Sequence, residues 1–208
     1  DTPTNSFATM NPLIKAYGTV TFSEGNLKAV GDGSWNIELS TMPALSGKWY
    51  WETLVGSTNA QYGIFPANVQ QNLLNIMETY GMVYYSNGEK RIDGTFTSYG
   101  LSFAGGDIMG CAVDMGASTV TWYKNGSSQG AVSFSGTVAS ADGLVLGGMF
   151  NSDTTYFNFG ADSSFAGEKT AQGNQDDNEK GDFYYDVPAT YLALCTDNLS
   201  DPEIALPG

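Results

Sequence analysis

The chain has 208 residues, of which 26 are glycine, 13% are aromatic and only 14% are charged, a composition typical of proteins built from strands and turns. The formal net charge of −14 disfavours nucleic acid and anionic membranes as partners, because contacts to phosphates require basic patches. No histidine is present, which excludes Ser-His-Asp and Cys-His catalysis and histidine-ligated zinc.

Short alternating segments bounded by Gly, Asn, Ser and Asp predict many short strands. The pairs Asn87-Gly88 and Asn125-Gly126 predict hairpin turns, because both residue types tolerate a positive φ. In chain order, the predicted strands are residues 18–22, 27–30, 35–39, 48–52, 82–85, 89–93, 107–114, 119–124, 129–134, 144–150 and 154–159.

Three segments depart from the strand pattern. Val69–Glu78 holds leucine and methionine at helical spacing and predicts one short helix or ordered insert. The polar stretch Ala166–Asp182 predicts a long surface loop, and the chain becomes apolar again over Phe183–Leu194. Residues 201–208 contain two prolines and predict an exit linker.

The strand count predicts an all-β fold, in which two antiparallel sheets stack into a sandwich. We expect residues 1–200 to form a single domain. Cys111 and Cys195 have no neighbouring cysteine in sequence, and we expect both to be free and buried. No apolar run of about 18 residues is present, so no membrane insertion is expected. Because the first residue is Asp1, we expect a mature product or a domain of a longer chain.

Four segments, in order, resemble the SPRY (B30.2-like) family. They are residues 47–52 (GKWYWE), 106–114 (GDIMGCAVD), 119–126 (TVTWYKNG) and 157–160 (FNFG), and the resemblance covers residues 45–165. It implies a bent two-sheet sandwich of the concanavalin A-like, jelly-roll type. It also implies binding rather than catalysis, with proteins or other ligands held by loops on one face.

The ending Tyr191–Pro202 resembles that of SPRY-like domains in bacteriophage structural proteins, although Asp197 and Ser200 depart from the usual residues. The resemblance implies a non-catalytic recognition module of a phage tail or fibre protein, located on the virion, that binds a host surface glycan or protein. Two alternatives stay open: a virion-structural or decoration module that contacts other virion proteins, and an intracellular SPRY protein-interaction adaptor.

Aromatic residues divide into a predicted core and a predicted ligand site. Trp49, Trp51, Trp122 and Tyr123 occupy motif strands and are expected in the core. Tyrosine and arginine commonly anchor interfaces, which favours a binding role for the hairpin around residues 84–91 and its neighbours. Alternation allows only one of the two adjacent tyrosines of this hairpin to face the core. The candidate ligand-binding residues are Tyr62, Tyr84, Tyr85, Arg91, Tyr99 and Trp35.

Acidic residues supply weaker candidates. Glu52, Asp107 and Asp114 lie at motif positions and could supply an acid/base pair. Asp107 and Asp114 flank a strand, however, which favours bonds to turn amides, so we expect no catalytic residues. The 176–182 loop resembles part of a calcium loop. No cofactor is expected, with Ca²⁺ as the open alternative and Asp176, Asn178 and Asp182 as its candidate ligands.

Overall fold

A computed structural model describes residues 4–14, 18–56, 59–68, 80–151 and 153–200. In this part the chain forms two antiparallel sheets and 3-10 turns, η3 (Gly136–Ser140) and η4 (Thr196–Asn198). The strands are β1 (Val20–Ser23), β2 (Lys28–Gly31), β3 (Asn36–Leu39), β4 (Lys48–Leu54), β5 (Ala60–Pro66), β6 (Met82–Tyr85), β7 (Glu89–Ile92), β8 (Thr95–Ser98), β9 (Ile108–Asp114), β10 (Thr119–Lys124), β11 (Ser127–Ser133), β12 (Leu144–Phe150), β13 (Thr154–Asn158) and β14 (Leu192–Ala193).

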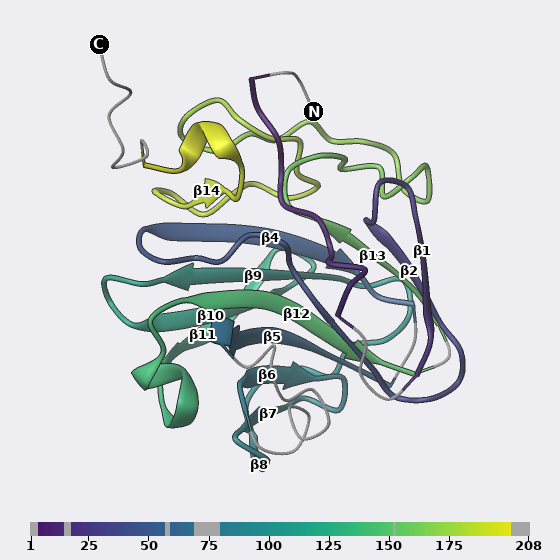
Figure 1. Cartoon of the computed structure of the whole chain (residues 1–208), viewed down its shortest axis with the longest axis vertical. Helices are drawn as coiled ribbons and strands as arrows, with labels where there is room; N and C mark the ends of the chain where they lie inside the picture. The colour runs from purple at the N-terminus through teal and green to yellow at the C-terminus, as the bar shows by residue number, and fades with distance from the viewer. Residues whose placement is uncertain (1–3, 15–17, 57–58, 69–79, 152, 201–208) are drawn as a thin grey trace.

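The larger sheet has the order β1-β2-β13-β4-β9-β10-β11, with β14 added in parallel to the start of β4. The smaller sheet has the order β3-β12-β5-β6-β7-β8. Figure 1 shows the strands of both sheets running in similar directions, with β12 crossing in front of β10. The all-β sandwich predicted from the strand count is therefore confirmed. The predicted insert at Val69–Glu78 lies outside the described residues.

Alternation along the motif strands decides which side chains fill the space between the sheets. Trp49 and Trp51 on β4 and Trp122 on β10 are 5%, 1% and 0% exposed, which confirms their predicted place in the core. Tyr123, the next residue on β10, points to the other face and is half-buried beside Tyr50. Both cysteines are free and buried, as predicted.

The C-terminal segment, residues 160–198, packs over the outer face of the larger sheet, where Figure 1 shows it above β4. Phe183 is fully buried against Tyr50, with ring centroids 5.4 Å apart. Near its end the segment pairs with the start of the chain, through a bridge between Phe7 and Cys195 and a bond from Ala8 N–H to Leu194 O (2.8 Å). The segment thereby joins the two ends of the described chain to the sandwich.

Candidate functional site

A cavity of about 460 Å³ lies where several loops meet at one end of the sandwich. The β6–β7 turn, the β8–β9 loop and the end of β10 all contribute to its wall. The lining residues are Tyr85, Ser86, Asn87, Ser102, Phe103, Ala104, Asp107 and Lys124. Its size falls within the range of small-ligand and side-chain pockets.

One side of this cavity is held by a network around Asp107. Its carboxylate accepts hydrogen bonds from Ala104 N–H (2.9 Å) and from the side-chain amide of Asn125 (2.7 Å). Lys124 Nζ lies 3.3 Å from Asp107 Oδ2 and donates to Ser102 O at 2.7 Å. Partial burial opposes ionisation of Asp107, but these donors outweigh it and lower its pKa. The loop is therefore fixed, and it presents an ammonium and a carboxylate together at the cavity.

The other side carries Tyr85, which is half-buried on the outer face of β6. Its hydroxyl donates to Asn59 Oδ1 (2.8 Å), and its ring lies 5.9 Å from that of Phe96 on β8. Phe96 is 44% exposed. An aromatic surface therefore continues from the cavity toward the edge of the smaller sheet.

Two predicted ligand residues lie in the core instead. Tyr84 is fully buried, with its ring edge-on to Tyr99 (5.1 Å between centroids) and Phe103 (5.3 Å), and it donates to Leu101 O. Desolvation raises its pKa to about 12. Tyr62 is 2% exposed, and its hydroxyl lies 3.3 Å from Thr155 Oγ1. Alternation on β5 and β6 directs both rings between the sheets, so the structure places them in the core and not on the surface where the sequence predicted a ligand.

The remaining predicted residues are dispersed. Arg91 is 6% exposed on the outer face of β7, where its guanidinium lies 5.7 Å from the centre of the Phe96 ring. Tyr99 is half-buried and donates to Gly130 O on β11. Trp35 packs at the margin of a separate apolar cluster with Ile37 and is not among the residues lining the cavity. Of the six predicted residues, Tyr85 lines the cavity.

The cavity residues that sequence reasoning missed are Ser86, Asn87, Ser102, Phe103, Ala104 and Lys124. Asn87 was assigned only to a turn, and Lys124 only to a motif strand. Their convergence depends on the long β8–β9 loop folding back against β10, and no local pattern indicates this contact.

The candidate acid/base residues do not converge. Asp107 and Asp114 lie at opposite ends of β9, and Asp114 pairs with Lys48 (3.2 Å). Glu52 lies between them on β4 under the C-terminal segment, where it is fully buried and accepts the backbone N–H groups of Tyr184 and Tyr185, both at 2.8 Å. Asp107 and Asp114 therefore hold turns, as expected, and Glu52 holds the packed C-terminal segment.

The first of the predicted calcium ligands, Asp176, lies at the centre of a hydrogen-bond network within the C-terminal segment. Asp176 is 6% exposed, and each carboxylate oxygen accepts two N–H donors. The donors are the backbone of Asn178 and Lys180 to one oxygen, and Ala193 N–H and the Asn198 amide to the other, at 2.8–2.9 Å. These four donors make Asp176 the centre of a hydrogen-bond network that orders the loop. Among the described residues, no group of three or more Asp, Glu or Cys is arranged to hold a metal ion.

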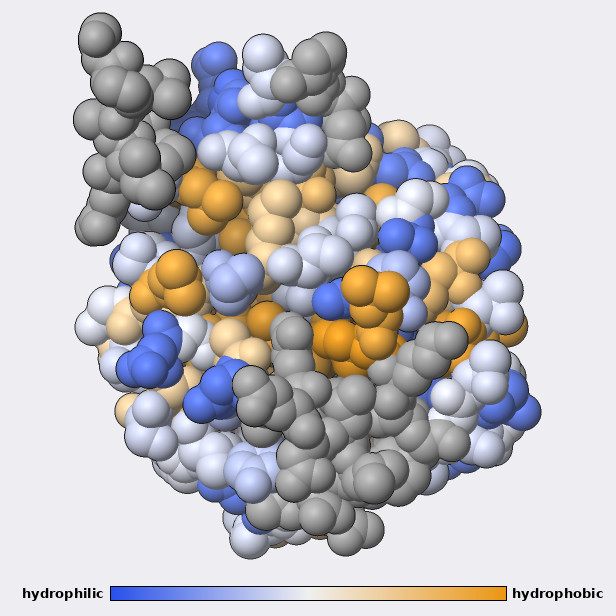
Figure 2. All heavy atoms as spheres, in the orientation of Figure 1, coloured by the Kyte–Doolittle hydropathy of each residue, from blue (hydrophilic) through white to orange (hydrophobic). Residues whose placement is uncertain are grey.

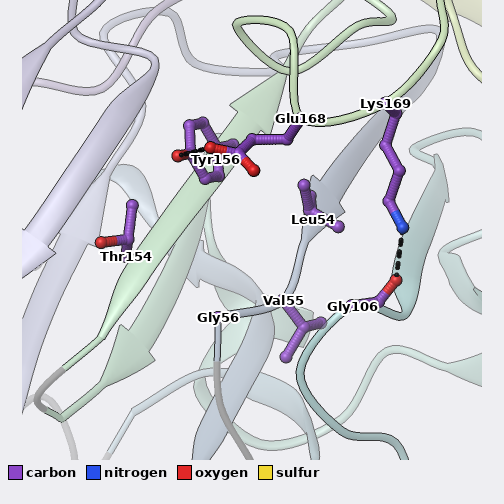
Figure 3. Close-up of a pocket in the computed structure, with 8 residues that line it drawn as sticks. All are labelled: Leu54, Val55, Gly56, Gly106, Thr154, Tyr156, Glu168 and Lys169. Carbon is purple, nitrogen blue, oxygen red and sulfur yellow. Dashed lines mark hydrogen bonds between the residues drawn. The ribbon is translucent and has the colours of Figure 1, made fainter.

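A second cavity, of about 370 Å³, lies where the C-terminal segment meets the ends of β4 and β13. Figure 3 shows Tyr156 bonded to Glu168 (2.7 Å) and Lys169 Nζ bonded to Gly106 O (3.0 Å). Both charged side chains bond to neighbours across the cavity and tie the segment to the sandwich.

The two stacked antiparallel sheets make the described part of the chain a β-sandwich domain. The SPRY domain model matches residues 48–162, more than half of the chain, and the protein belongs to the SPRY family. SPRY domains are in general protein-interaction modules.

Solved structures agree with this fold. The SPRY domain of human HERC1 is 21% identical, with a TM-score of 0.56 over 71% of this chain and 96% of that one. Another human SPRY domain is 15% identical (TM-score 0.54; 66% and 93% covered). Stonustoxin is 17% identical (TM-score 0.53), with 73% of this chain and 27% of that chain covered. In the described part of the chain, no helix has the length and apolar character to cross a membrane.

Proposed function

We propose that this protein is a non-catalytic recognition domain that binds a segment of a partner protein at the loop-end cavity beside Tyr85. The observation that supports this proposal is the cavity itself, which combines a fixed Asp107–Lys124 pair with the half-buried ring of Tyr85, and the exposed ring of Phe96 lies beside Tyr85. Interfaces of this kind use aromatic anchors surrounded by polar groups. Membership of a family of protein-interaction modules favours a protein ligand over a glycan.

The biological setting proposed here is a bacteriophage virion, in which the domain contacts the host surface. The resemblance of residues 191–202 to the endings of phage structural proteins supports this setting. The high negative charge fits a neutral or cationic partner.

The test is binding of the labelled protein to a displayed library of linear peptides, to a glycan array and to whole marine bacterial cells. Tyr85→Ala should weaken the selected interaction by about tenfold or more, the effect expected of an aromatic anchor. Tyr191→Ala is the matched control, because Tyr191 is also half-buried but lies on the C-terminal segment. Equal loss in both variants would contradict the proposed site, and selection of a glycan alone would contradict the protein ligand.

An assembly role is a second candidate, favoured by a separate apolar groove of about 310 Å³ lined by Met42, Pro43, Leu45, Trp49 and Leu199. Leu45 is 67% and Leu199 40% exposed. Figure 2 also shows apolar residues gathered in the middle of one face. Contacts within a virion would bury such surface. Binding to other virion proteins that is lost in Leu45→Asp but retained in Tyr85→Ala would favour this role.

A further inference from the structure

The outer edge of the smaller sheet is formed by β8, whose four residues are all exposed. Its sequence, Thr-Phe-Thr-Ser, has high strand propensity and contains no charge and no proline. Its pairing with β7 is continuous and has no bulge. Natural edge strands usually carry a charge, a proline or a bulge, or are covered by another segment, because an open edge is a template for another strand.

Two other edges in the described part of the chain are protected. The β10–β11 pairing is irregular between Thr121 and Tyr123, and the β8–β9 loop bonds to β11 through Leu101 N–H and the Gln129 side chain (3.0 Å). Along β3, the N-terminal segment covers the edge with a bond from Asn11 N–H to Leu39 O (2.9 Å) and a bridge between Met10 and Ser40. The open edge at β8 therefore contrasts with these two edges.

The register shows which backbone groups of β8 are free. Tyr99 N–H donates to Gly88 O (3.0 Å). Counting back from Tyr99 in steps of two, Thr97 lies opposite Lys90 and Thr95 lies opposite Ile92, so these two residues of β8 are the ones hydrogen-bonded to β7. In an antiparallel pair the bonded residues alternate. The N–H and C=O groups of Phe96 and Ser98 therefore point away from β7 and have no backbone partner among the described residues.

This edge is continuous with the proposed ligand site. Phe96 contacts Tyr85, which lines the cavity. Beyond Ser98 the chain passes through Leu101, which is 65% exposed, to Ser102 in the cavity wall. The open hydrogen-bonding groups, the two exposed apolar side chains and the cavity thus follow one another along the same stretch of chain.

We propose that the partner of this domain binds as an extended peptide segment that adds a strand to β8, with an apolar side chain against Phe96 and Tyr85. This inference rests on the proposed function and names the form of its ligand. The size of the edge favours a peptide over a second copy. Four residues span about 13 Å, too little to bury the roughly 1,200 Å² of a stable dimer. Two copies, each with a net charge of −14, also repel each other.

The experiment uses a linear peptide selected from the displayed library against the whole chain, with affinities measured by fluorescence polarisation. Ser98→Pro removes one outward N–H and leaves the bonds of Thr95 and Thr97 to β7 intact. It should weaken binding by about tenfold, the value of one backbone hydrogen bond of about 1.4 kcal/mol. Ser98→Ala, the matched control, keeps the N–H and should bind as the unmodified protein does.

Hydrogen exchange supplies a readout that does not depend on a variant. The amides of Phe96 and Ser98 should exchange rapidly in the free protein and become protected with the peptide bound. Unchanged exchange at these amides, or equal affinity of Ser98→Pro, would overturn the inference. If strand addition fails these tests but Tyr85→Ala still causes loss of binding, the proposed function stands without strand addition at β8. If Tyr85→Ala also has no effect on binding, the proposed loop-end site and the strand addition at β8 both fail. Concentration-dependent dimerisation that Ser98→Pro abolishes would overturn the peptide as occupant.

Discussion

Single buried carboxylates hold the C-terminal segment in place. Asp176 accepts four N–H donors from three stretches of that segment, including Ala193 on β14. Asp176→Asn places an amide against some of these donors and should lower the free energy of unfolding by about 1–3 kcal/mol. Urea denaturation checks this, with the exposed Asp142→Asn as the control. An equally small effect in both variants would contradict the role given to Asp176.

Glu52 is buried without a cationic partner, which predicts a pH dependence. Desolvation raises its pKa from 4.5 to about 7, against the lowering effect of the Tyr184 and Tyr185 amides. The same cause raises the pKa of Glu38, inside the sandwich, to about 8. The folded state thus retains protons that the unfolded chain releases, and both groups make the protein less stable as the pH rises from about 4.5 to 8.

Among the elements, the C-terminal segment covers the outer face of the larger sheet. It lies beyond residue 162, where the family match ends, yet it buries Phe165 and Phe183 and covers Glu52. A chain ending at residue 162 would expose the outer face of β4 and β9, and we expect it to aggregate or unfold, whereas a chain ending at residue 200 should fold. Circular dichroism and size-exclusion chromatography distinguish the two. A monomeric, folded 1–162 chain would contradict the prediction.

The strands predicted from the sequence differ from the missed strands in their pattern of apolar and polar side chains. Motif strands such as β4 and β9 carry long alternating or apolar runs, so they were found. Central β5 was missed because Gln61 and Gly63 interrupt its apolar pattern, and its strand character depends on pairing with β12 and β6 on both sides. The edge strand β8 was missed because four exposed polar and aromatic residues give no periodic signal. The cavity could not be predicted either, because its wall requires the β8–β9 loop, which also gives no periodic signal in the sequence.

At the scale of the whole molecule, the pH response has a defined sign. Asp107, Asp114 and Asp162 have lowered pKa values, because burial is outweighed by hydrogen bonds, so they stabilise the fold above about pH 4. Glu38 and Glu52, whose pKa values are raised, lower the stability of the fold as the pH rises further. Repulsion within a chain of net charge −14 lowers the stability in the same direction. Stability should therefore be greatest near pH 4–5, roughly, and fall toward pH 8.

Urea midpoints across this pH range test the prediction. Glu38→Gln and Glu52→Gln remove the ionising groups, so each should flatten the fall in stability between about pH 5 and 8. Asp142→Asn, at an exposed residue, is the control and should leave the slope unchanged. A stability that rises over this range would show that neither buried acid titrates as described.

The most direct test of the central claim, recognition of a protein segment at the loop end, is hydrogen exchange across the whole chain with and without a saturating selected peptide. Protection is expected at residues 85–87 and 102–104, which line the cavity, and along β8. Protection confined instead to the groove around Leu45 and Leu199 would contradict it and would identify the apolar groove as the binding surface.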